Sequence, residues 1–270
     1  LLPQSMTTIG IDISSVRGDD HLDRHLVIEW VLPESAYVPE GHVTARYSFQ
    51  LSKGTKMSIE PSGNPVVKDS FRMLQISSGD LFVSFDKSTG KMVSLSHRNR
   101  ELLARSPKID LYAPPTDNHA RIDQDVWKKH FLDAVQNHVS SFSYEKSDHA
   151  VKVEVKLVVA PPVYEFGYDV TVTYVITDGT VHQMISGEPF GAFPSYLPRI
   201  GCTWGLHDTL QNVTWFGKGP GESYSDSKEA SVHGLYKSTI DELFEDYIHP
   251  QNNGNRHDVS WLMLGDATTS

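Results

Sequence analysis

The strongest constraint on the fold is a strict alternation of apolar and polar residues in several short segments. In the run VKVEVKL (residues 151–157), apolar side chains alternate with charged ones, and the run YDVTVTYVI (168–176) has the same period of two. Because successive side chains of a strand point to opposite faces, this pattern predicts strands with one face in a core and one in water. Two prolines at 161–162 separate the runs, which predicts a connection between neighbouring antiparallel strands.

Earlier segments follow the same rule and add a hairpin. Residues 26–31, 43–50 and 81–85 also alternate, so we expect a strand at each. The third segment runs into the turn-forming stretch DKSTG (86–90), and apolar residues resume at 92–95. This arrangement predicts a hairpin with a five-residue loop that contains glycine.

Helical spacing is confined to two places. Apolar residues recur at steps of about four between 122 and 135, which predicts one helix with Asp123 as a candidate N-cap. Residues 241–248 are compatible with one or two helical turns, which Pro250 would end.

The chain is therefore predicted to be mostly β, with sandwich architecture and not alternating βαβ units. Its 39% hydrophobic and 10% aromatic content is enough for a buried core, which excludes global disorder. The turn-rich stretch EPSGNP (60–65) predicts a domain boundary.

Charge and composition exclude several classes of function. A formal net charge of −10 argues against a nucleic-acid partner, because no phosphate-neutralising face is implied. No apolar run is long enough for a membrane-spanning helix. Cys202 is the single cysteine, so no internal disulfide is expected. The first residues lack the features of a signal peptide, so we expect a cytoplasmic protein, and the apolar run just before residue 270 suggests that the chain is cut from something longer.

Motifs for common active sites are absent, which leaves paired carboxylates. The loop GKGPGE (217–222) lacks the spacing of a phosphate-binding loop, and the sequence contains no HExxH, CxxC or GxSxG. Glycosidases use two carboxylates, and Asp117 and Glu222 both lie in loops where they could line a sugar site. The alternative is that these two carboxylates fix their loops by accepting hydrogen bonds from backbone amides.

Aromatic residues leave a similar choice open. They can act as stacking platforms for sugar rings or as parts of the sandwich core. The candidates are Trp127, Trp204, Trp215, Trp261, Tyr224 and Tyr236.

Several stretches together resemble the large β-galactosidases of glycoside hydrolase family 2. AYVPEGHV (36–43) resembles a segment near the end of the fourth domain of that family. LYAPPTDN (111–118) followed by Trp127 resembles a stretch of the fifth domain. The remaining matches are LPRIG (197–201), WFGKGPGESYSD (215–226) and YIHPQNNGNR (247–256).

The resemblance implies an architecture and a set of partners. Residues 1–64 would be the C-terminal part of an immunoglobulin-like sandwich, and residues 65–270 an incomplete β-supersandwich related to galactose mutarotase. In this family the supersandwich packs against a (β/α)₈ barrel, in the same chain or in a large subunit, and that barrel carries both catalytic glutamates and the Mg²⁺ and Na⁺ sites. The chain would then bind no cofactor itself.

The resemblance also implies a function. The parent enzyme would be an oligomeric, retaining β-galactosidase that hydrolyses terminal β-D-galactosides such as lactose. This chain would be a non-catalytic part that shapes the active-site pocket and supports assembly, and it would be inactive alone. The pocket-lining residues expected from the matched loops are Asp117, Asn118, His119, Glu222 and Tyr224. His119 departs from the family pattern, which has an aspartate there.

Two other functions remain open. The first is a stand-alone carbohydrate-binding or mutarotase-like module, which needs a His and Glu pair for acid–base ring opening; His233 and Glu222 are the candidates. The second is an assembly subunit that makes no contact with sugar.

Overall fold

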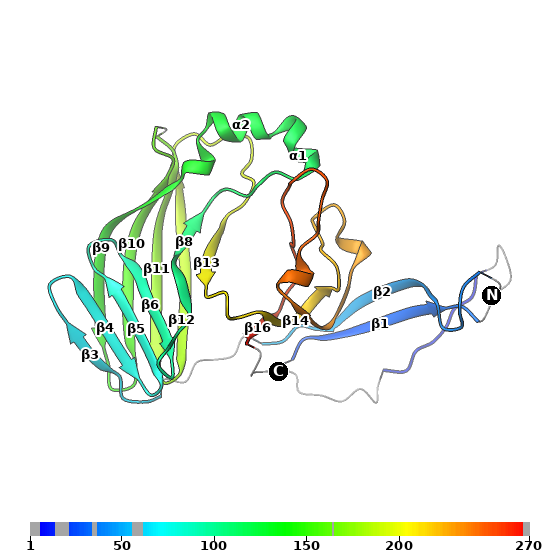
Figure 1. Cartoon of the computed structure of the whole chain (residues 1–270), viewed down its shortest axis with the longest axis horizontal. Helices are drawn as coiled ribbons and strands as arrows, with labels where there is room; N and C mark the ends of the chain where they lie inside the picture. Colours follow the sequence, from blue (N-terminus) through cyan, green and yellow to red (C-terminus); the bar gives the residue numbers. More distant parts are fainter. Residues whose placement is uncertain (1–5, 14–21, 34–36, 56–61, 164, 267–270) are drawn as a thin grey trace.

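The computed structural model describes residues 6–13, 22–33, 37–55, 62–163 and 165–266, and strands dominate these ranges (Figure 1). The strands are β1 (Arg24–Val31), β2 (Val43–Ser52), β3 (Val66–Asp69), β4 (Met73–Ser78), β5 (Leu81–Asp86), β6 (Lys91–His97), β7 (Arg100–Glu101), β8 (Leu103–Asp110), β9 (Gln136–Lys146), β10 (Val151–Ala160), β11 (Gly167–Thr177), β12 (Thr180–Phe190), β13 (Gly201–Leu206), β14 (Asn212–Gly219), β15 (Val232–Thr239) and β16 (Trp261–Gly265). The helices are α1 (Asp117–Ile122) and α2 (Gln124–Lys129), with short 3₁₀ turns at Leu132–Ala134, Lys228–Ala230 and Asp241–Leu243. The prediction of a mostly β chain is confirmed.

Two antiparallel sheets form a sandwich at one end of the molecule (Figure 1). One sheet has the order β3-β4-β5-β6-β7 and the other the order β12-β11-β10-β9. Between them lies the main core, which includes Leu74, Ile76, Val83, Phe85, Met92, Val151, Val153, Val155, Val172 and Ile176. Burial of these apolar side chains is the main stabilising contribution to this end of the chain.

The predicted pairing of residues 151–157 with residues 168–176 is confirmed. They form β10 and β11, which are antiparallel, with Val153 opposite Tyr174 and Val155 opposite Val172. These four side chains are buried, whereas Lys152 on the other face is exposed. The period of two in the sequence therefore corresponds to the two faces of one sheet.

The hairpin of β5 and β6 also forms, with a shorter loop than the five residues expected. Asp86 pairs with Lys91 and so belongs to the strand. Gly90 adopts a φ of +66°, and a Cβ atom there would lie 2.6 Å from the Cγ1 of Val155. The loop glycine is thus required both by its backbone conformation and by the close approach of the opposite sheet.

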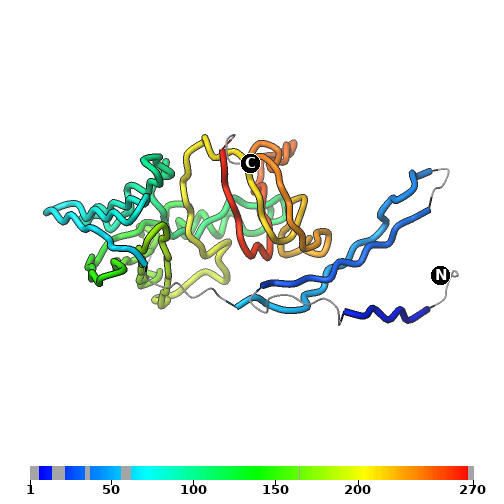
Figure 2. Tube along the Cα trace, turned by 90° about the horizontal axis from the view of Figure 1, so that it is seen from below, coloured from blue at the N-terminus to red at the C-terminus, as the bar shows by residue number. Residues whose placement is uncertain are grey.

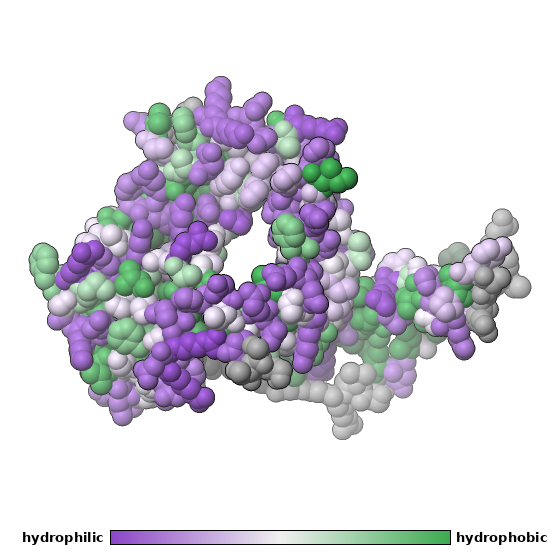
Figure 3. Space-filling view, viewed as in Figure 1, coloured by the Kyte–Doolittle hydropathy of each residue, from purple (hydrophilic) through white to green (hydrophobic). Residues whose placement is uncertain are grey.

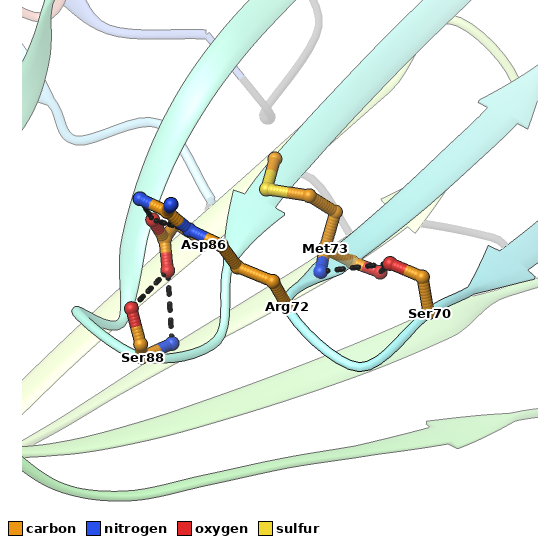
Figure 4. A network of polar contacts seen from close by, with 5 residues as sticks. All are labelled: Ser70, Arg72, Met73, Asp86 and Ser88. Atoms are coloured by element: carbon orange, nitrogen blue, oxygen red, sulfur yellow. Dashed lines mark hydrogen bonds and ion pairs between the residues drawn. The ribbon is translucent and has the colours of Figure 1, made fainter.

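Asp86 holds this hairpin together through a network of polar contacts (Figure 4). Its Oδ1 accepts hydrogen bonds from the hydroxyl of Ser88 at 2.6 Å and from the amide of Ser88 at 2.9 Å, and its Oδ2 accepts from two nitrogens of Arg72 at 2.8 and 3.0 Å. The hydrogen bonds from Ser88 and Arg72 lower the pKa of Asp86 from 3.8 to about 2. The ionised carboxylate is therefore favoured in the folded state.

We expect Asp86→Asn to lower the free energy of unfolding at neutral pH by about 1–2 kcal/mol, because charge-assisted hydrogen bonds are lost. The loss is limited to this size because the Arg72 side chain is exposed and its charge is screened by solvent. In the wild type, the stabilisation is fully present above the unfolded pKa of 3.8 and is lost as the pH falls toward the folded value of about 2. Urea denaturation at a series of pH values should show that the variant loses less free energy of unfolding than the wild type as the pH falls through this window. Equal losses in both proteins would contradict the stabilising role of the ionised Asp86 carboxylate.

A second group of strands lies beside the sandwich. β14 is central in a three-stranded sheet of order β15-β14-β16, and the pair β13-β8 lies between this sheet and the sandwich (Figure 1). The β1-β2 hairpin projects away from the rest, as Figures 1 and 2 both show. His25 of β1 stacks on His233 of β15, with ring centroids 3.7 Å apart.

The predicted boundary between residues 64 and 65 falls between β2 and β3, and residues 56–61 lie outside the described residues. The division into domains 1–64 and 65–270 stays a prediction.

The helical predictions are only partly correct. The single helix expected over 122–135 is wrong: α1 begins five residues earlier, at Asp117, α2 ends at Lys129, and a 3₁₀ turn follows. Phe131 has a φ of +53°, a left-handed conformation that an α-helix cannot contain. Of the turns expected over 241–248, the structure shows the 3₁₀ turn Asp241–Leu243, after which Phe244 is extended. In the described ranges, none of the helices has both the length and the apolar character needed to cross a lipid bilayer.

Candidate functional site

The helical pair α1–α2 is held on the molecule by a small second core. Trp127 of α2 is 2% exposed and packs with Leu132 and Phe166. α1 itself has no buried residue. Because α2 carries the buried tryptophan, α1 is free to present its polar side chains at the surface.

A cavity of about 400 Å³ lies between the start of α1 and two loops of the β14 sheet. One loop follows β14 and the other precedes β16. The residues that line it are Thr116, Asp117, Asn118, His119, Tyr224, Ser225, Asp226, Tyr247, Gln251 and Asn252. In Figure 3, hydrophilic residues predominate around the opening between the sandwich and the β14 sheet.

Backbone and side-chain hydrogen bonds tie α1 to the loop before β16. The amide of Asp117 donates to the Oε1 of Gln251 at 2.7 Å, and the amide of Asn252 donates to the carbonyl oxygen of Pro115 at 3.0 Å. The cavity wall is thus assembled from segments that are more than 100 residues apart in the sequence.

The third segment reaches the same place from the loop after β14. The Nδ2 of Asn118 lies 3.4 Å from the Oδ2 of Asp226, which brings an amide and a carboxylate together at the cavity. Beside them, the Oγ1 of Thr116 and the Nδ1 of His119 are 2.9 Å apart. The contact between Asn118 and Asp226 is long, and both contacts are exposed, so each of the four groups can form a hydrogen bond with a ligand instead.

Two tyrosines supply the aromatic part of the lining. Burial raises the pKa of Tyr224, and the nearby charge of Glu222 raises it further, so the phenol keeps its proton at neutral pH. Tyr247 lines the cavity from the other loop. Phenols, amides and carboxylates around aromatic faces suit a neutral ligand with several hydroxyl groups.

The structure brings four of the five predicted site residues to this cavity: Asp117, Asn118, His119 and Tyr224. Glu222 is not among the lining residues. Its carboxylate accepts hydrogen bonds from the hydroxyl groups of Tyr224 and Tyr247 and from the amide of Gly254. Glu222 therefore lies behind the tyrosines that face the cavity.

Sequence reasoning did not name the other six lining residues, which are Thr116, Ser225, Asp226, Tyr247, Gln251 and Asn252. All six lie inside the stretches 111–118, 215–226 and 247–256 that carry the family resemblance. The signal was therefore present, but a motif does not tell which of its side chains face a cavity.

The residue pair considered for mutarotase-like chemistry is not brought together by any contact among the described residues. His233 stacks on His25, whereas the hydrogen bonds of Glu222 go to Tyr224, Tyr247 and Gly254. Nor do the described ranges hold a group of three His, Cys, Asp or Glu side chains that could bind a metal ion. The side chains that line the cavity offer hydrogen bonding and stacking.

Comparison with known proteins identifies the family. Residues 77–269, more than half of the chain, match the family described as Beta galactosidase small chain. The chain belongs to the β-galactosidase small-chain family. This confirms the resemblance seen in the sequence.

The chain is also similar to part of several longer proteins. The chain is 28% identical over 265 residues to a β-galactosidase of Kluyveromyces lactis, which covers 94% of this chain and 26% of that protein. It is 26% identical over 240 residues to a β-galactosidase of Priestia megaterium, and this alignment covers 86% of this chain and 22% of that protein. With a β-galactosidase of Lactobacillus delbrueckii subsp. bulgaricus it shares 30% identity over 213 residues, which covers 77% of this chain and 20% of that protein. The chain thus spans about a quarter or less of the length of these relatives.

Proposed function

We propose that this chain is the non-catalytic small-chain region of a retaining β-galactosidase and that it forms part of the wall of the galactoside pocket. The observation that carries the proposal is the cavity at α1, where Asp117, Asn118, His119 and Tyr224 come together. The names of the relatives, all β-galactosidases, support the substrate class.

The chemistry of the cavity suits a sugar. Asp117, Asn118 and Asp226 provide carboxylate and amide groups for ring hydroxyls, and Tyr224 and Tyr247 provide aromatic faces. Retaining hydrolysis needs an acid and a nucleophile about 5 Å apart, and we propose that both belong to a catalytic barrel outside this chain. The small-chain region would orient the galactoside and exclude water from the pocket.

The test is substitution of Asp117 and Asn118 in the complete β-galactosidase that contains this region. We expect Asp117→Ala and Asn118→Ala each to lower kcat/KM for lactose by about 10-fold, mainly through KM, since each removes hydrogen bonds to the bound sugar. Steady-state kinetics with lactose and with a nitrophenyl galactoside measures this effect.

Asp125→Ala is the matched control, because Asp125 is an exposed acidic residue of the neighbouring helix α2 and does not line the cavity. It should behave as wild type. If Asp117→Ala and Asn118→Ala both leave kcat and KM unchanged, the cavity does not contact the galactoside and the proposal fails.

A further inference from the structure

We propose that Glu222 is a positioning residue that clamps together the two loops forming one wall of the cavity, and that it acts on the sugar through Tyr224 and Tyr247 and not by contact. This inference rests on the proposed function. It assigns to Glu222 a different role from that of the residues that line the cavity.

The first argument is the set of donors around one carboxylate. The Oε2 of Glu222 accepts from the amide of Gly254 at 2.9 Å and lies 3.5 Å from the hydroxyl of Tyr224. Its Oε1 accepts from the hydroxyl of Tyr247. Both oxygens therefore have partners within the protein, and two of the three donors come from the loop before β16.

The second argument is that neighbouring groups join the same two loops. The amide of Ser223 donates to the carbonyl of Asn255 at 2.7 Å, and the Nδ2 of Asn255 donates to the carbonyl of Ser223 at 2.6 Å. The side chain of Ser223 is fully buried at this contact. The loops are thus paired directly beside Glu222.

A half-buried cation completes the clamp. Arg256 donates through Nη2 to the carbonyl of Pro220 at 3.2 Å and through Nη1 to the carbonyl of Gly254 at 2.9 Å, and its guanidinium lies 5.7 Å from the ring centroid of Trp215. Burial lowers the pKa of Arg256, and the charge of Glu222 opposes that effect. Glu222 therefore also supplies countercharge for the half-buried cation that joins the two loops.

Loss of this carboxylate has a specific consequence for the cavity. The phenols of Tyr224 and Tyr247 would lose their shared acceptor, and both tyrosines line the cavity. Asp226 and Gln251 lie on the same two loops and would lose their fixed distance to α1. Substrate binding should suffer more than the chemical step, because the catalytic carboxylates lie elsewhere.

The experiment uses the complete β-galactosidase and two readouts, amide hydrogen exchange and steady-state kinetics. In Glu222→Ala we expect the amides of residues 222–227 and 245–256 to exchange about tenfold faster or more, and KM for lactose to rise about tenfold with kcat within about twofold of wild type. Glu222→Gln should fall between wild type and Glu222→Ala. The oxygen of the glutamine side chain can still accept a hydrogen bond, but its NH₂ group is a donor and cannot accept one from a second donor.

Tyr247→Phe provides a double-mutant cycle. Tyr247→Phe removes one hydrogen-bond donor to Glu222, so we expect KM to rise less than in Glu222→Ala. The double variant with Glu222→Ala should have the same KM as Glu222→Ala alone. Glu145→Ala is the control, since Glu145 is exposed on β9 in the opposite part of the molecule, and it should match wild type in both readouts.

The outcomes separate this inference from the proposed function. Unchanged exchange in Glu222→Ala would overturn the clamp, even with an altered KM, because the carboxylate would then act by contact with the sugar. Faster exchange with unchanged KM would also overturn the positioning role, while Asp117→Ala and Asn118→Ala would still decide whether the cavity binds galactoside. Additive effects of Glu222→Ala and Tyr247→Phe on KM would show that the two residues act independently and would overturn the inference as well.

Discussion

Trp127→Ala is expected to lower the free energy of unfolding by about 3–5 kcal/mol, which is typical of removing a large aromatic side chain from a core. Trp127 is 2% exposed and, with Leu132 and Phe166, forms the small core that holds the helical pair. α1 has no buried residue, so its position depends on α2 and on its hydrogen bonds to the two loops of the β14 sheet. Chemical denaturation of the chain, followed by far-UV circular dichroism, measures the effect.

The variant should also disturb the cavity. The ring of His119 lies 5.3 Å from the ring of Trp127, and α1 begins at Asp117. Val126→Ala is the control, because Val126 is on the same helix but 40% exposed, and its truncation should cost about 0.5 kcal/mol or less. A cost for Trp127→Ala as small as that of the control would show that the helical pair does not depend on the buried tryptophan.

Gly191→Ala is expected to destabilise the chain by about 2–5 kcal/mol, because steric overlap adds to an unfavourable backbone conformation. Gly191 has a φ of +76°, and a Cβ atom there would overlap the carbonyl oxygen of Glu165 and lie 2.8 Å from the Cα of Phe166. Both neighbours are backbone atoms, so relief requires movement of the chain that carries Phe166 of the second core. Chemical denaturation measures the change.

Gly179→Ala separates the two causes. Gly179 also has a positive φ, +68°, but no atom lies within 4 Å of the position that its Cβ would occupy. We expect a cost of about 1 kcal/mol there, from the backbone conformation alone. Equal costs at the two glycines would mean that the close contact at Gly191 is relieved without penalty.

The pattern of the sequence was enough to predict the sandwich strands β5, β6, β10 and β11, but not the other strands of the two sheets and not the helices. Residues 151–157 and 168–176 became β10 and β11 in the register that places Val153 opposite Tyr174. A period of two is a local property, and it persists because each strand buries one face. The prediction of one helix failed because α1 and α2 are separate on the two sides of Asp123, and the left-handed Phe131 lies between α2 and the 3₁₀ turn Leu132–Ala134.

The candidate site could be predicted in part. Asp117, Asn118, His119 and Tyr224 were expected to line a pocket from the matched motifs, and the structure places them around one cavity. The other six lining residues were not named, although they lie in the same motifs. A motif fixes which residue types are present, but not which of them face one another.

The sequence alone determined that the chain is built of two-faced strands and that it carries the motifs of the β-galactosidase small-chain family. Both are properties of short segments, which composition and order within a segment can encode. Only the tertiary structure decided that α1 meets residues 224–226 and 247–252, and that Glu222 lies behind them with its carboxylate bound to two phenols and an amide. The reason is that these contacts join segments far apart along the chain, and their distances depend on how whole sheets pack, which no local pattern specifies.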